Sequence, residues 1–364
     1  MTLVPAPIVA RVNGGSTRRR LLGATGAALL SACAGGLAPT VSTSKRRVGM
    51  LYSGSVPVPS SDVMAAFHDG MKNESFVHEI DYVIDTRAAE GDYSRLLPLA
   101  QELVALGVDV IVANTTAPTQ AARAATSSVP IVMVASHDPV DAGVVASLAH
   151  PGGNVTGQSL MGADLMPKQL EILSEAAPFR RLGYLTPYAA SPAPGYPSVT
   201  DMFEAAMRER AKPFGIDVRT FTVRVPSDVD AALAMVVAQQ VDALYVIESP
   251  FWFVELPSPP ATKGQRPFDR VTQLARDRRL PSIAGLRPYA QQGLLMSYGD
   301  ARTNLELFRG VTRFVARIFR GAKPADLPVE RPTRFALTLN AKTAAAIGLT
   351  LPRTLLDKAD AVIS

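Results

Sequence analysis

The chain has 364 residues, of which 47% are hydrophobic and 19% charged, so it is long enough for two domains with buried cores and its composition excludes a disordered protein. The formal net charge is +5, but four of the basic residues are arginines that precede Cys33 in a stretch without any acidic residue. Beyond this stretch, 33 basic residues stand against 32 acidic ones. With nearly equal numbers of basic and acidic residues, this part of the chain is not strongly basic as a nucleic-acid-binding protein would be, so we expect no nucleic-acid partner.

Residues 1–32 have the pattern of an export signal. Arg18 and Arg19 precede a weakly hydrophobic run over 21–30, which is shorter than the roughly 20 residues that a membrane-spanning helix needs. The paired arginines resemble a twin-arginine signal, which exports folded proteins. The sequence therefore predicts a signal peptide over 1–32 and a periplasmic or otherwise extracytoplasmic protein, and it leaves open the twin-arginine or the general secretory route.

Cys33 is the single cysteine of the chain and ends the segment Leu-Ser-Ala-Cys. This segment resembles the lipobox of bacterial lipoproteins, in which the cysteine thiol carries diacylglycerol. Residues 33–44 are rich in small Gly, Ser and Thr residues, which is typical of a flexible tether. We therefore expect lipidation at Cys33, attachment to a membrane through a lipid anchor, and no disulfide within the chain.

From Lys45 onward, short apolar runs alternate with longer amphipathic stretches, the pattern of parallel sheets covered by helices. The first half predicts strands over 48–52, 80–84, 108–113 and 131–134 and helices over 63–71, 93–106 and 117–126. After the turn residues Pro151 to Asn154 the pattern restarts, with helices over 166–175, 199–211, 228–239 and 268–278 and strands over 182–185, 218–223, 243–247 and 282–284. The last third predicts a strand over 294–298, a helix over 304–319 and a strand over 335–339.

This succession predicts an α/β fold with two doubly wound parallel-sheet lobes. Because the C-terminal third returns to elements of both lobes, several crossovers are needed, as in the multi-strand hinge of type I periplasmic binding proteins. We expect lobe 1 to comprise 45–158 and 296–325, and lobe 2 to comprise 159–295 and 326–364.

Short segments spread over the chain carry a family resemblance. They are Asp138-Pro139-Val140, residues 144–149, 151–157, 293–299 and 321–330, Lys342-Thr343-Ala344 and Ile347-Gly348-Leu349. In this order they resemble the ABC-transporter substrate-binding protein family that includes the TrpX-like proteins. The resemblance implies an extracytoplasmic receptor that captures a small-molecule solute and passes it to an ABC permease driven by cytoplasmic ATPase subunits. The chain itself has no Gly-x-x-x-x-Gly-Lys-Ser/Thr phosphate loop, so these partners supply the ATPase.

Ligands of open α/β sheets bind beyond the carboxyl ends of the strands, so the strand-to-helix turns hold the candidate binding residues. In the first lobe the candidates are Gly54, Ser55, Asn114, Thr115, Thr116, Ser136 and Asp138. Hydroxyls and backbone amides at helix starts suit a carboxylate, and Asp138 suits an ammonium group, so an amino acid or a similar polar solute fits this set. The alternative is that these side chains only cap helices.

In the second lobe the candidates are Tyr188, Ser191, Glu248, Ser249 and Tyr298. The two tyrosines suit stacking on a flat or aromatic ligand, although aromatic residues near strand ends also serve as packing. The turns that hold Tyr188 and Glu248 depart from the Asn-rich and Asp-Pro turns of the family, which leaves the solute open. The Pro-rich stretch 256–267 predicts a surface loop.

The sequence holds little that could carry out catalysis. The histidines His68, His78, His137 and His150 lack the spacing of metal ligands, and neither a Gly-x-Ser-x-Gly elbow nor a dinucleotide fingerprint occurs. We therefore expect no enzyme activity, no metal and no cofactor. Two alternatives remain at this point: a ligand sensor that signals to a membrane receptor, and an enzyme on a flavodoxin-like fold.

Overall fold

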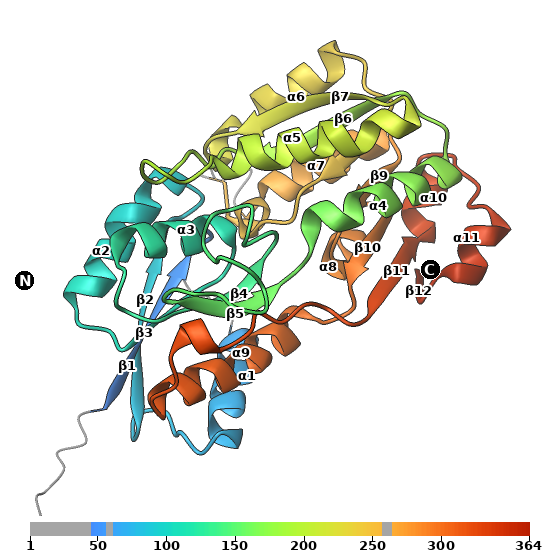
Figure 1. The fold of residues 1–364 in the computed structure, drawn as a ribbon. Coiled ribbons are helices and arrows are strands. Elements are labelled where there is room, and N and C mark those ends of the chain that lie inside the picture. Colours follow the sequence, from blue (N-terminus) through green and yellow to red (C-terminus); the bar gives the residue numbers. More distant parts are fainter. Residues whose placement is uncertain (1–44, 56–60, 257–263) are drawn as a thin grey trace, which may run out of the picture. The chain divides into compact units, whose positions relative to one another are not determined.

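The computed structural model describes residues 45–55, 61–256 and 264–364 (Figure 1). The predicted signal peptide, Cys33 and the predicted tether lie outside the described residues, as does most of the predicted Pro-rich loop. Thr43–Ser364 packs as one unit, and this unit contains two β-sheets.

The first sheet has five parallel strands in the order β2-β1-β3-β4-β5. These strands are β1 (Arg46–Tyr52), β2 (Tyr82–Ala88), β3 (Val110–Ala113), β4 (Ile131–Ser136) and β5 (Val155–Ser159). Its faces are covered by α2 (Leu96–Ala105) and α3 (Thr116–Ala125) on one side and by α1 (Ser61–Asn73) and α9 (Asn304–Phe319) on the other. Val110 and Val112 pack with α1 and α9, whereas Ile111 and Ala113 pack with α2 and α3. Strand β3 is apolar throughout because helices cover both of its faces.

The second sheet has seven strands in the order β12-β11-β10-β9-β8-β6-β7, and only the pair β10 and β11 is antiparallel. These strands are β6 (Arg181–Pro187), β7 (Asp217–Val223), β8 (Ala243–Val246), β9 (Ser282–Ala284), β10 (Met296–Asp300), β11 (Phe335–Asn340) and β12 (Ala361–Ile363). Helices α4 (Gly162–Ala176) and α5 (Val199–Ala211) pack on one face, and α6 (Val229–Ala238) and α7 (Pro267–Asp277) pack on the other.

Shorter helices complete the described chain. The α-helices are α8 (Arg287–Gln291), α10 (Ala341–Ala346) and α11 (Arg353–Lys358). The 3-10 helices are η1 (Tyr93–Arg95), η2 (Lys212–Phe214), η3 (Pro226–Asp228), η4 (Pro250–Phe253) and η6 (Pro324–Asp326). Of these, η1, η4 and α8 contribute residues to the space between the two sheets.

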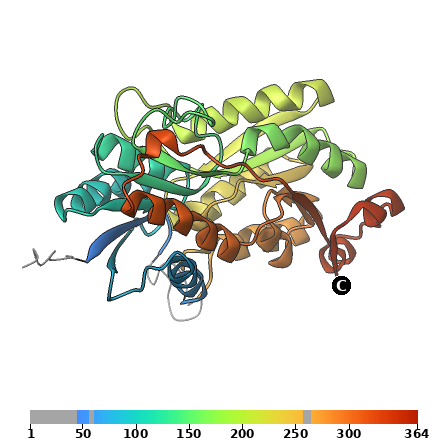
Figure 2. The same ribbon diagram turned by 60° about the horizontal axis from the view of Figure 1, so that its bottom comes forward.

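The chain crosses between the two sheets after β5, after β10, and again between Glu330 and β11. Figure 2 shows the last crossing as an extended segment that leads to β11. The backbone N–H of Ser159 donates to the carbonyl of Glu330 at 2.8 Å, and that of Ala301 donates to the carbonyl of Arg334 at 3.0 Å. Because the crossing segments are hydrogen-bonded to one another, they form a multi-strand hinge. The predicted fold class is confirmed.

Two segments lie in the other lobe from the one expected. Strand β10, expected in lobe 1, pairs with β9 and β11 in the second sheet, and the chain returns to the first lobe with α9. Residues 326–330, expected in lobe 2, lie against the first sheet, where the Thr156 hydroxyl donates to the carbonyl of Leu327 at 2.7 Å. The physical reason is that the hydrophobic pattern of a short segment shows that it is buried but does not identify the sheet against which it packs.

Candidate functional site

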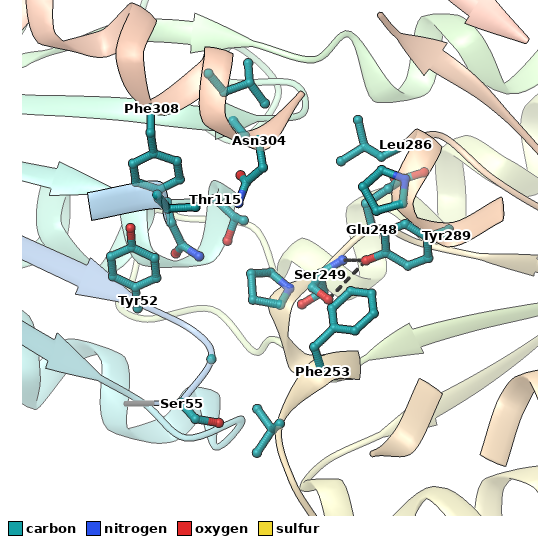
Figure 3. A pocket seen from close by; sticks show the side chains of 18 of the residues that line it. Tyr52, Ser55, Thr115, Glu248, Ser249, Phe253, Leu286, Tyr289, Asn304 and Phe308 are labelled. Carbon is teal, nitrogen blue, oxygen red and sulfur yellow. Dashed lines mark hydrogen bonds between the residues drawn. The ribbon is translucent and has the colours of Figure 1, made fainter. Parts of the chain in front are cut away.

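A cavity of about 760 Å³ lies where the carboxyl ends of the two sheets face each other, and residues of both lobes line it (Figure 3). The first lobe contributes the turns after β1, β3 and β4 together with the start of α9. The second lobe contributes the turn after β8, helix η4 and helix α8. This volume is in the range of pockets that enclose a small organic ligand.

Aromatic pairs stand on both sides of the cavity. In the first lobe, Tyr52 and Phe308 stack with ring centroids 5.9 Å apart and an interplanar angle of 9°. In the second lobe, Phe253 and Tyr289 meet at 5.4 Å with an angle of 67°. Figure 3 shows the two pairs on opposite sides of the space between the lobes. An aromatic or apolar group held between them would contact ring faces and edges from both lobes.

The Tyr289 hydroxyl fixes the turn that follows β8. It accepts from the backbone N–H of Ser249 at 2.7 Å and donates to the carbonyl of the same residue at 3.1 Å (Figure 3). Because one phenol satisfies both backbone groups, the turn keeps its conformation without a neighbouring strand. This turn carries Glu248 into the cavity wall.

Glu248 and His137 form a buried pair between the lobes. Oε2 of Glu248 lies 3.7 Å from Nε2 of His137, and each side chain is only 7% exposed. Oε1 of Glu248 also accepts from the backbone N–H of Gly285. Burial raises the pKa of Glu248, and the nearby imidazole opposes this shift. Burial lowers the pKa of His137, and the Glu248 carboxylate opposes that shift in turn.

Arg302 brings a positive charge to the hinge side of the cavity. Its guanidinium binds both carboxylate oxygens of Asp300, the shorter contact being 2.6 Å, and donates to the side-chain oxygen of Gln158. Asp300 ends β10 and Gln158 lies in β5, so Arg302 joins two of the hinge segments. The charge-assisted pair is geometrically specific, because guanidinium and carboxylate meet through two parallel bonds.

The lobes also touch at the turns of β1 and β2. The hydroxyls of Tyr93 and Ser249 lie 2.5 Å apart across the lobes, and the Tyr93 ring meets Phe251 edge-on at 6.3 Å. A Cβ on Gly54 would lie 3.1 Å from the side chain of Pro250. The structure therefore has a closed cleft, with the lobes in contact beyond the cavity as well as at the hinge.

Six of the sequence-predicted site residues line the cavity: Gly54, Ser55, Asn114, Thr115, Glu248 and Ser249. The amide oxygen of Asn114 accepts from the backbone N–H of Ser53 at 3.3 Å, which fixes the turn after β1. Thr115 precedes α3, so it stands at the positive end of that helix dipole.

Three other predicted residues of the first lobe support the cavity from behind. The Thr116 hydroxyl accepts from the backbone N–H of His137 at 3.1 Å and lies 3.3 Å from the hydroxyl of Ser136. Asp138 accepts from the backbone N–H of Ala163 at 2.9 Å, and burial raises its pKa to about 6. These side chains bond to backbone groups and to each other, and they are absent from the cavity lining; of the three, only Asp138 binds a backbone N–H at the start of a helix.

The last three predicted residues lie elsewhere in the second lobe. Tyr188 and Ser191 line a separate cavity of about 490 Å³, where the Arg224 guanidinium lies 4.1 Å from the centre of the Tyr188 ring. Tyr298 packs against Phe335 with ring centroids 6.3 Å apart. Tyr188 follows β6, which is the neighbour of β8 in the sheet, and Tyr188 lies at the second cavity rather than at the first.

Several cavity residues were not among those predicted: the four aromatic rings, His137 and Arg302. Tyr52 and His137 each follow the rule of strand ends, so this rule could have identified them. Phe253 and Tyr289 come from short helices within long connections, and Phe308 comes from a helix distant in sequence from its lobe. No local pattern marks these three rings.

Within the described residues, no group of three or more His, Cys, Asp or Glu side chains is placed to hold a metal ion. The helices of the same part of the chain are all too short or too polar to cross a bilayer.

The two lobes, the hinge and the shared cavity define a solute-binding protein of the type I periplasmic-binding-protein class. The chain belongs to the ABC transporter substrate binding protein family, which matches residues 57–363. The family resemblance of the sequence is thereby confirmed, and this is a family of binding proteins rather than of enzymes.

Similar proteins extend over most of the chain. A tyrosine-binding protein of Clostridioides difficile (strain R20291) is 26% identical over 310 residues, which are 84% of this chain and 82% of that protein. An ABC domain from Streptococcus pneumonia, solved in complex with L-Trp, is 26% identical with a TM-score of 0.69 and covers 88% of this chain and 100% of its own. A conserved domain protein from Vibrio cholerae shares the fold, with 23% identity, a TM-score of 0.72 and the same two coverages.

Proposed function

We propose that this protein captures an amino acid with an aromatic side chain outside the cytoplasmic membrane and delivers it to an ABC permease. The observation that carries this proposal is the cavity between the lobes, which combines aromatic walls with one buried carboxylate and one arginine. The similar proteins support the same chemistry, since one is a tyrosine-binding protein and another was solved with L-Trp.

An amino acid would lie in this cavity with each of its groups matched. Its ammonium would pair with Glu248, and its carboxylate would lie near Arg302 and the N-terminal amides of α3. Its ring would lie between the aromatic pair of the first lobe and that of the second. Of the residues predicted from the sequence, we propose Gly54, Ser55, Asn114, Thr115, Glu248 and Ser249 as direct binding residues. Binding at both lobes would stabilise the closed cleft.

Ligand binding is tested by the thermal unfolding of the full chain with and without candidate solutes. A ligand at about 100 times its Kd adds roughly 2.7 kcal/mol of stability, which raises the unfolding temperature measurably. We expect L-tryptophan or L-tyrosine to raise it, and L-alanine to have a much smaller effect because it lacks a ring for the aromatic walls. If neither aromatic amino acid raises the unfolding temperature, the proposed substrate class is wrong.

Export and anchoring belong to the same proposal. A receptor tied by lipid at Cys33 would remain close to its permease while its lobes open and close, and residues 33–44 would provide the tether. Replacing Cys33→Ser should abolish labelling of the protein by a radioactive or clickable fatty acid in the native host. Retention of the label in the variant would contradict the lipobox interpretation.

A further inference from the structure

The buried pair of His137 and Glu248 joins the two lobes inside the proposed ligand cavity. His137 follows β4 of the first sheet and Glu248 follows β8 of the second, and their side chains approach to 3.7 Å. The backbone of His137 is fixed, because its N–H donates to Thr116 and its carbonyl accepts from the Ser159 hydroxyl at 2.8 Å. The imidazole therefore presents Nε2 to the carboxylate from a firmly held turn.

Besides the contact with His137, the Glu248 carboxylate accepts from two backbone N–H groups, that of Gly285 and its own. A Cβ on Gly285 would collide with this carboxylate, so the glycine allows the close approach. These two backbone donors do not compensate for taking an ionised carboxylate out of water, and burial still raises the pKa of Glu248. Charge balance in the ligand-free cleft therefore requires a proton, either on the carboxyl group or on the imidazole.

The neighbouring groups named here do not supply a positive charge that would balance the Glu248 carboxylate in place of this proton. The phenol groups of Tyr184, Tyr245 and Tyr289 interact electrostatically with Glu248 and stay neutral, because burial raises the pKa of each. The negative charge of Glu204 in α5 further raises the pKa of Tyr184, and that of Asp138 further raises the pKa of Tyr245. The cavity wall also contains Glu90, Glu255 and Arg302, and Arg302 is bound to Asp300. Phe203 contributes only its ring, 5.3 Å from the imidazole.

A ligand's ammonium group changes this balance. When it binds Glu248, it brings a full positive charge beside the imidazole, and two cations cannot share one carboxylate without repulsion. The carboxylate then pairs with the ammonium, His137 becomes neutral, and the proton that the pair held moves to solvent. A ligand without an ammonium group leaves the proton in place.

We propose that His137 and Glu248 share one proton in the closed, ligand-free cleft and that the ammonium group of the ligand replaces this proton at Glu248. The inference rests on the proposed function, since it requires an amino acid in the cavity. It makes His137 a positioning residue that holds Glu248 ready for a cation. It also makes capture dependent on pH, because protons compete with the ligand below the pH at which the pair titrates. The affinity falls by up to about tenfold for each pH unit in that range.

The pair itself is tested without any ligand. NMR titration of the His137 ring in the full chain is compared between the wild type and Glu248→Gln, which keeps an oxygen for the Gly285 N–H. Removing the carboxylate removes the group that favours the imidazolium, so we expect His137 to titrate at least about one pH unit lower in the variant. Identical titration of His137 in both proteins would overturn the shared proton while leaving the proposed function intact.

The exchange is tested by calorimetry with L-tryptophan at about pH 6 in buffers of different ionisation enthalpy, which reports the number of protons released. We expect release of about one proton by the wild type and of almost none by Glu248→Gln. The desamino analogue indole-3-propionate is the matched control and should release no proton from the wild type. L-tryptophan that binds without releasing protons would overturn this inference alone. Failure of both L-tryptophan and L-tyrosine to bind would overturn the proposed function and this inference with it.

Discussion

At the scale of single residues, adjacent side chains after β4 have separate roles. His137 faces the cavity and Glu248 of the other lobe, whereas Asp138 turns away and accepts from the backbone N–H of Ala163 near the start of α4. Asp138 thus contributes to the position of α4 at the hinge exit rather than to the ligand site. Its burial should lower the stability of the protein near neutral pH, because a buried carboxylate is unfavourable in its charged form.

Replacing Asp138→Asn should stabilise the protein near neutral pH. A pKa raised from 3.8 to about 6 corresponds to roughly 3 kcal/mol of unfavourable free energy at pH 7, and the weaker hydrogen bond of the neutral amide offsets part of the gain. We expect a net gain of about 1–2 kcal/mol in the free energy of unfolding by urea at pH 7.5. The penalty develops between about pH 3.8 and pH 6, where the carboxyl group is ionised in the unfolded chain but neutral in the folded one, so most of the gain should be lost near pH 4.

The control for this measurement is Asp326→Asn at an exposed position of η6, which should change the free energy of unfolding by less than about 0.5 kcal/mol at either pH. Equal stabilities of the wild type and Asp138→Asn at pH 7.5 and pH 4 would show that Asp138 keeps an ordinary carboxyl environment.

Half of the residues that the rule of strand ends predicted line the cavity between the lobes. It identified Asn114 and Glu248 as cavity residues because each lies within two residues of the end of a buried strand, and strand direction alone decides at which edge of a parallel sheet they lie. It did not separate residues that face the cavity from those that turn back to bind backbone groups, such as Thr116 and Asp138. That distinction depends on turn geometry, which local sequence specifies poorly.

At the scale of elements, amphipathic helices with clear caps were predicted best. The helix over 304–319 has its predicted bounds because Thr303 and Glu306 form a capping box at its start. The strand predicted over 294–298 lies at Met296–Asp300, and its assignment to the first lobe was wrong. The C-terminal α10, α11 and β12 were not predicted, since they are too short to show a periodic pattern.

The contact between α1 and α9 joins segments that lie far apart in the sequence, and both ribbon views show the two helices side by side (Figures 1 and 2). Gly70 allows this contact, because a Cβ there would lie 2.5 Å from the Thr312 hydroxyl and 2.9 Å from the carbonyl of Arg309. We expect Gly70→Ala to lower the free energy of unfolding by about 1–3 kcal/mol, despite the higher helix propensity of alanine.

Urea denaturation measures this change, with Lys72→Ala on the exposed side of the same helix as the control. The control should stay within about 0.5 kcal/mol of the wild type. A variant Gly70→Ala that is as stable as the wild type, or more stable, would mean that α1 and α9 do not pack this closely.

At the scale of the whole molecule, charged side chains contribute to the contacts that hold the cleft closed. Arg302 binds Asp300 and Gln158 at the hinge, while Glu248 pairs with His137 between the lobes. The hydroxyls of Tyr93 and Ser249 add a third contact between the lobes. A ligand that takes over part of these contacts shifts the balance between open and closed lobes only by its difference in affinity for the two states.

A crystal structure of the protein grown with L-tryptophan tests the proposed binding mode most directly. We expect the indole ring in the cavity between Tyr52 and Phe308 on one side and Phe253 and Tyr289 on the other, with the ammonium group on Glu248. Density for the ligand only in the smaller cavity at Tyr188, or an ammonium group that avoids Glu248, would contradict this binding mode.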